Sequence, residues 1–73
     1  MPKLPAVSPK KLVKLLLRLG FEHKHTVGSH QVFKHPDGRR AVIPMHNRDI
    51  PKGTLMAILK DIKVTKEELV TLL

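Results

Sequence analysis

The 73-residue chain contains no cysteine, tryptophan or tyrosine, and phenylalanine occurs only twice. Without cysteine it can form neither a disulfide nor a thiolate metal site, and it offers no thiol nucleophile. Two phenylalanines are too few for a sheet that stacks RNA bases. No apolar stretch approaches the ~18 residues that a membrane span requires. The first residues lack the apolar core of a secretory signal, so we expect a cytoplasmic protein without a membrane anchor.

Acidic residues are also scarce, with 6 Asp and Glu against 14 Lys and Arg, which gives a net charge of +8. Only Glu22, Asp37 and Asp49 precede residue 61, which disfavours a two-metal nuclease because such sites need several carboxylate ligands. The excess is concentrated in residues 1–40, where nine basic and two acidic residues give +7. A one-sided excess attracts polyanions, and nucleic acid is the commonest one inside a cell. A basic surface that is merely solvated is the alternative.

A first helix is predicted over residues 9–19, after a short extended lead-in over residues 1–7. Ser8 is a good N-cap, and Pro9 suits the first helical position. Gly20 follows where a left-handed C-terminal cap is wanted. The apolar residues repeat with the spacing of one helix face: Leu12, Leu15, Leu16 and Leu19.

The middle of the chain predicts three antiparallel strands, over Phe21–Thr26, Ser29–His35 and Arg39–Pro44. A tight turn at Val27-Gly28 would join the first two strands, because glycine accepts backbone angles that other residues resist. The sequence Pro36-Asp37-Gly38 strongly predicts a turn between the second and third strands. Short connections of this kind produce a meander.

A second helix is predicted from about Pro51, with the same apolar spacing over Leu55, Ile58, Leu59 and Ile62. Thr65 and Glu68 form a capping box that begins a short terminal helix. We therefore predict one α+β domain over residues 1–73, with its core over about residues 8–62. Both main helices should pack on one face of the sheet and leave the other face open.

Five histidines are the main source of acid–base chemistry. RNA carries its own nucleophile, the 2′-hydroxyl, so a ribonuclease needs only a base, an acid and cations near the phosphate. His23 and His25 lie two apart and should share one strand face, but two imidazoles alone make a weak zinc site. We expect neither a metal nor another cofactor.

Alternation along the second strand places His30, Val32 and Lys34 on one face and Phe33 on the other. If Phe33 packs under the helices, His30 and Lys34 point to the open face. Gly28 would allow a phosphate to approach the backbone, and Ser29 could donate a hydrogen bond to it. The alternative is that Gly28 only serves the hairpin and that His30 is an ordinary surface histidine.

Several motifs in the right order resemble the HicA-type toxins, a family of small mRNA interferases. The resemblance spans about residues 8–62 and rests on Leu19–Phe21, Gly28–Phe33, His35–Arg39, Val42–His46, Lys52–Leu55 and Ile58-Leu59. It implies the fold of the double-stranded-RNA-binding domain, in which a three-stranded sheet separates two helices along the chain. The order of elements read from the periodicities agrees with it.

The resemblance also implies that the chain cleaves mRNA, arrests translation and is neutralised by a HicB-like antitoxin. The catalytic histidine of the family's glycine–serine–histidine motif falls on His30. One departure is visible, because members often carry a polar or basic residue where this chain has Val27. For the cleavage step, our hypothesis is that His30 removes or delivers a proton at the scissile phosphate, while Gly28 and Ser29 contact the RNA and four cations on neighbouring strands hold its backbone: Lys24, Lys34, Arg39 and Arg40. His25 and His46 are candidates for a second proton-transfer group.

Two other functions remain open at this point. The chain could be a non-catalytic module that reads double-stranded RNA by shape, although only Lys52 provides charge at the start of the second helix. It could also be an interaction subunit that docks an acidic partner. Val13, Leu17 and Val32 are candidates for exposed apolar surface at such an interface.

Overall fold

The computed structural model describes residues 4–73. Its elements follow the predicted order: α1 (Pro9–Arg18), β1 (Glu22–Val27), β2 (His30–Lys34), β3 (Arg40–Pro44), α2 (Lys52–Ile62) and α3 (Lys66–Leu72). The limits differ from the predicted ones by one residue at most ends, so Phe21, Ser29 and His35 lie just outside the strands. The first three residues of the predicted lead-in lie outside the described part. Among the described residues, no helix is long and apolar enough to cross a membrane.

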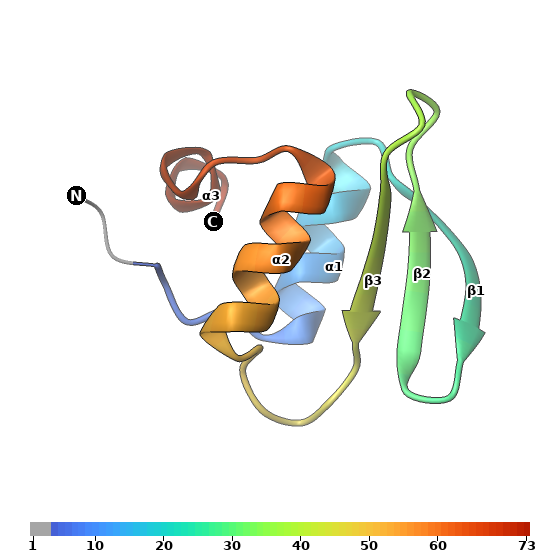
Figure 1. Ribbon diagram of the computed structural model, residues 1–73, viewed down its shortest axis with the longest axis horizontal. Coiled ribbons are helices and arrows are strands. Elements are labelled where there is room, and N and C mark those ends of the chain that lie inside the picture. The colour runs from blue at the N-terminus through green and yellow to red at the C-terminus, as the bar shows by residue number, and fades with distance from the viewer. Residues whose placement is uncertain (1–3) are drawn as a thin grey trace.

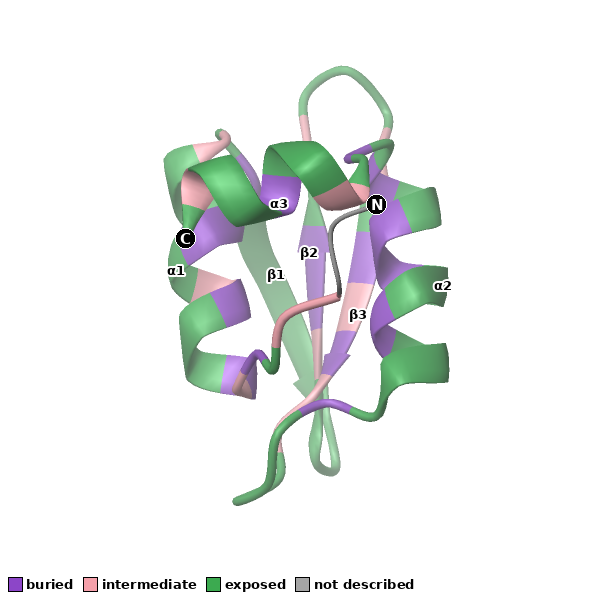
Figure 2. Ribbon diagram, turned by 90° about the vertical axis from the view of Figure 1, so that its left-hand side faces the viewer, coloured by how far each residue is buried: buried purple, intermediate pink, exposed green. Residues whose placement is uncertain are grey.

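The described chain forms three layers (Figure 1). The strands form an antiparallel sheet in the order β1-β2-β3, and α1 and α2 pack side by side on one of its faces. Figure 2, viewed from the side of α3, shows this short helix in front of the α1–α2 layer, with the sheet behind. No other element of residues 4–73 covers the opposite face of the sheet (Figure 1). We call this uncovered side the outer face.

The core lies between the sheet and the helices. The apolar stripes predicted for α1 and α2 meet the inward side chains of β2 and β3 there, and Leu69 of α3 joins them from the far side. Burial of apolar surface is the main favourable term in folding, and in a chain of this size one cluster must supply most of it. Its largest fully buried members are Phe21, Phe33, Leu12, Leu16, Ile43, Leu55, Ile62, Leu69 and Val7.

Side chains cap the starts of α1 and α3, as predicted. The hydroxyl of Ser8 accepts the backbone N–H of Lys11 at 3.2 Å at the start of α1. At the start of α3, Thr65 and Glu68 form both bonds of the capping box, each at 3.1 Å. These bonds satisfy backbone donors that have no partner inside a helix.

The C-terminal end of α2 has a lysine at the position that usually holds glycine. Lys63 adopts the left-handed conformation, with φ 57°, and its N–H donates to the Lys60 carbonyl at 3.2 Å. The next N–H, that of Val64, donates to the Leu59 carbonyl at 3.0 Å. Together the two bonds form a Schellman motif, which normally places glycine at the left-handed position. A residue with a Cβ pays roughly 1–2 kcal/mol in this conformation.

We therefore predict that Lys63→Gly raises the free energy of unfolding by about 0.5–1 kcal/mol, since relief of backbone strain outweighs the added freedom of the unfolded chain. Chemical denaturation measures the change. Lys60→Gly is the control, because the same substitution inside α2 should lower stability by about 1 kcal/mol. A loss of stability in both variants would contradict the strain argument.

Candidate functional site

The strand register decides which side chains lie on the outer face. Phe33 pairs with Ala41 of β3, and both point into the core, where Phe33 is 1% exposed. Their neighbours along each strand point the other way. His30 and Lys34 are therefore exposed on the outer face, as the alternation predicted.

Three rows of side chains cross the outer face, as the register defines them. The first row holds His30, the second is centred on Val32, and the third holds Lys34 and Arg40, which pair with each other. His30 and Lys34 are four residues apart, so about 13 Å separates the first row from the third at a rise of ~3.3 Å per residue. In full, the rows are Val27–His30–Pro44, His25–Val32–Val42 and Glu22–Lys34–Arg40.

Gly28 and Ser29 form a two-residue turn between β1 and β2, because Val27 pairs directly with His30. Gly28 has φ 58°, whereas Ser29 is not among the residues with positive φ. This combination is that of a type II′ turn, which favours glycine at its first central position. The turn alone explains the glycine. Apart from its two chain neighbours, no atom of residues 4–73 lies within 4 Å of where a Cβ would stand, so the backbone here is open to an approaching group.

A hydrogen bond brings a second histidine to this turn. The N–H of Met45, just after β3, donates to the Ser29 carbonyl at 2.6 Å. The residues that follow, His30 and His46, have ring centroids 6.4 Å apart and planes at 83°. From the sequence, His46 was only one of two candidates for a second proton-transfer group, because no sequence pattern shows where the loop after β3 runs.

The expectation that His23 and His25 share a face is wrong. The pairing of β1 with β2 shifts between them, so that His23 lies opposite Phe33 and His25 opposite Val32. A β-bulge of this kind inserts one residue, here Lys24, and reverses the alternation beyond it. His25 therefore lies on the outer face, whereas the ring of His23 packs 5.4 Å from that of Phe33. Among residues 4–73, no three metal-ligating side chains cluster.

The predicted cations lie in different places. Lys34 and Arg40 are exposed on the outer face. Lys24 lies at the bulge, with its ammonium 3.9 Å from a Glu22 carboxylate oxygen, and both groups are exposed. An exposed pair at that distance is weak and leaves Lys24 free to bind another anion.

Arg39 lies on the other side of the sheet, which differs from the expectation that groups it with the RNA-holding cations. Its Nη1 donates to the Ile62 carbonyl at 2.6 Å, and its Nε donates to Asp37 at 2.8 Å. The guanidinium also lies 5.1 Å above the Phe21 ring. A cation that bonds the last carbonyl of α2 is placed to stabilise the helix end. Side chains alternate between the two faces of a strand, so the neighbouring residues Arg39 and Arg40 should point to opposite faces. This pattern in the sequence could have predicted their different positions.

His35 has a similar structural position. Its Nε2 donates to the Leu19 carbonyl at 3.0 Å, and its Nδ1 accepts the backbone N–H of Asp37 at 3.1 Å. Its ring contacts Phe21 edge-on, with centroids 5.0 Å apart. Any Cβ on Gly20, which has φ 96°, would come within 3.0 Å of the His35 ring. Some residues of the Leu19–Phe21 and His35–Arg39 motifs therefore pack against each other and have a structural role.

Asp37 links these two side chains. Its carboxylate accepts the backbone N–H of Arg39 at 3.0 Å as well as the guanidinium, and it lies 3.0 Å from Nδ1 of His35. The backbone hydrogen bond from Arg39, followed by the Arg39 guanidinium, lowers the pKa of the Asp37 carboxyl below its usual value.

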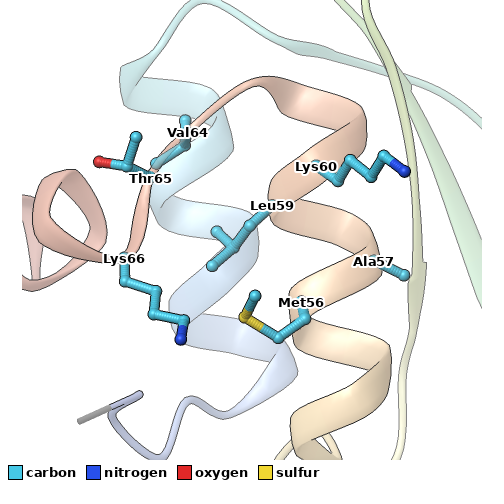
Figure 3. Close-up of a pocket in the computed structure, with 7 residues that line it drawn as sticks. All are labelled: Met56, Ala57, Leu59, Lys60, Val64, Thr65 and Lys66. Atoms are coloured by element: carbon cyan, nitrogen blue, oxygen red, sulfur yellow. The ribbon is translucent and has the colours of Figure 1, made fainter. Parts of the chain in front are cut away.

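The apolar surface differs in part from the expectation. Val32 is 4% exposed, because it lies in the middle strand between the outer-face side chains of β1 and β3, so its assignment to an exposed patch is wrong. Val13 is partly buried against the core, and Leu17 is 52% exposed. A separate apolar groove runs between α2 and α3, with Leu59 and Val64 among its lining residues (Figure 3). Its lining residues belong to α2, to the segment after it and to the start of α3, which lie on the side of the sheet opposite the outer face (Figure 1).

The helix–three strands–helix order, with both helices on one sheet face, is a fold like that of the double-stranded-RNA-binding domain. The outer face of this small α+β protein carries an exposed histidine beside a tight turn and the exposed cations Lys34 and Arg40. Residues 9–64 match the family model described as the HicA toxin of bacterial toxin–antitoxin systems. The chain belongs to this family and is therefore a toxin with an antitoxin partner. No curated protein matches the sequence significantly.

Arg39→Ala should lower the free energy of unfolding by about 2 kcal/mol, because it removes charge-assisted hydrogen bonds to a half-buried guanidinium. Arg40→Ala is the matched control, and it should change stability by no more than about 0.5 kcal/mol, as is usual for an exposed position. Urea denaturation measures both variants. Equal stabilities for the two would contradict a structural role for Arg39.

Asp37→Asn should lower the melting temperature most near neutral pH. Because the folded pKa of Asp37 is lowered, its ionised form stabilises the protein above the unfolded pKa of about 3.9. That contribution disappears as the pH falls through the folded pKa. The melting temperatures of the wild type and Asp37→Asn should therefore converge below about pH 4. Asp49→Asn, at an exposed loop position, should show no such convergence.

Proposed function

We propose that this chain is an endoribonuclease that cleaves mRNA without a metal ion, arrests translation, and uses His30 for proton transfer. The observation that carries the proposal is the exposed His30 ring on the outer face, directly after the Gly28-Ser29 turn. Membership of the HicA toxin family supports the same function. The cytoplasm is the proposed location, since mRNA is there.

The chemistry needs little beyond what the outer face offers. The 2′-hydroxyl of RNA attacks the adjacent phosphorus, and the bond from phosphorus to the 5′ oxygen breaks. An imidazole, with an ordinary pKa of about 6.5, is able to accept or deliver one of the two protons near neutral pH. The open Gly28 backbone and the hydroxyl of Ser29 lie beside His30 and are suited to contact the phosphate.

The cations would hold the strand on either side of the reacting bond. Lys34 and Arg40 lie about 13 Å from His30 along the sheet, so they are placed for a phosphate further along the RNA. Lys24 on the edge strand extends this basic surface. The engaged guanidinium of Arg39 makes it a poor candidate for RNA contact.

The antitoxin is proposed to be HicB-like and to cover the outer face. A partner seated there would hide His30 and the cations at once. The uncovered sheet, with cations at one end, suits a partner that presents acidic groups.

A non-catalytic double-stranded-RNA-binding module is the second candidate, and the fold favours it. Such modules bind phosphates across a major groove. Only Lys52 and Lys60 supply basic charge within α2, which speaks against this mode of binding.

His30→Ala should abolish cleavage of a labelled mRNA while leaving the melting temperature and RNA affinity nearly unchanged, because the ring is exposed and the cations remain. His23→Gln changes a histidine on the other side of the sheet; it is the control and should cleave as the wild type does. Cleavage is followed on a denaturing gel with a chelator present, and affinity by fluorescence anisotropy. Wild-type cleavage by His30→Ala would end the assignment, and binding without cleavage by the wild type would favour the second candidate.

A further inference from the structure

Two histidines from separate segments meet on the outer face. His30 begins β2 and His46 follows β3, yet their ring centroids are 6.4 Å apart. Both side chains are exposed. Within residues 4–73, no hydrogen bond or ion pair holds either ring, so their nitrogens are available to a ligand.

The backbone, rather than the side chains, sets this proximity. Ser29 and Met45 are joined by a 2.6 Å hydrogen bond, and each immediately precedes one of the two histidines. Pro44 also pairs with His30 in the ladder, and the N–H of His46 donates to the Pro44 carbonyl at 3.2 Å. Both rings therefore leave the sheet from fixed neighbouring points.

The charged and titratable groups around the two rings come from all three strands and from the loop after β3. On the outer face, the titratable groups that accompany His30 are His25 on β1, Lys34 on β2 and Arg40 on β3. The one carboxylate of the three rows, Glu22, is at the far end opposite Lys34. Arg48 and Asp49 share the exposed loop with His46.

We infer that His46 is a second catalytic residue, and that it forms a general acid–base pair with His30. The inference rests on the proposed ribonuclease function and deepens it. One neutral imidazole takes the proton of the 2′-hydroxyl as its oxygen bonds to phosphorus. The other, protonated, imidazole gives its proton to the departing 5′ oxygen. The products are a 2′,3′-cyclic phosphate and a 5′-hydroxyl, and solvent returns the two rings to their starting protonation states.

The pair predicts a bell-shaped dependence of kcat/KM on pH, with one limb from each histidine. His46→Ala should lower the cleavage rate by about 10²–10⁴-fold and remove one limb. His46→Gln keeps a polar side chain of similar size and serves if the alanine variant melts early. His23→Gln is the matched control, because the His23 ring packs against Phe33 on the other side of the sheet, and it should keep both limbs.

A modified substrate separates the two roles. The wild type is first used to map one cleavage site in a short RNA, and the 5′ oxygen at that bond is then replaced by sulfur. A thiolate leaves without protonation, so this substrate does not need the general acid. One of the two variants, His30→Ala or His46→Ala, should be restored to nearly the wild-type rate on it, and the other should stay slow.

The outcomes distinguish this inference from the proposed function. A wild type that does not cleave RNA, or a His30→Ala variant that does, overturns both. Cleavage that depends on His30, together with a His46→Ala rate equal to that of the wild type, overturns the pair alone. Rescue of both variants or of neither also overturns it, because a pair requires one acid and one base.

Discussion

Burial of Phe33 between the sheet and the helices is the constraint on which the outer face depends. Side chains alternate along a strand, so a buried Phe33 forces His30, Val32 and Lys34 to the other side of β2. A shift of one residue in the pairing would bury the histidine and expose the phenylalanine. The core thus fixes the orientation of the site, although no core residue contacts it.

The polar residues His35, Asp37 and Arg39, on the helix side of the sheet, have a structural role. Both main helices end near the β2–β3 turn, where His35 bonds the carbonyl of Leu19 and Arg39 bonds that of Ile62. Asp37 in the turn contacts both side chains. One hairpin therefore satisfies one free carbonyl group at each of two helix ends and joins the sheet to the helical layer. This gives the His35–Arg39 segment of this chain a structural reason to contain a histidine and an arginine that face away from the outer face.

Local patterns predicted the helices, the strands and the side-chain caps, because periodicity and capping act over a few residues. The errors came from features that depend on tertiary pairing. The bulge at Lys24 places His23 and His25 on opposite faces, with His25 on the outer one. Arg39 donates a hydrogen bond to the last carbonyl of α2 and therefore faces the helices. The proximity of His46 to His30 depends on where β3 ends against β2, which no local pattern encodes.

Under the proposed function, the residues that bind RNA and the residues that transfer protons lie at opposite ends of the outer face. The imidazoles of His30 and His46 occupy one end, the cations Lys34 and Arg40 occupy the other, and the middle row with the nearly buried Val32 lies between them. An RNA strand held by the cations must cross the middle row to reach His30. Affinity and rate therefore depend on different side chains. A protein partner that covers the middle row would block this path even if it left the imidazoles untouched, so neutralisation of the toxin does not require contact with His30.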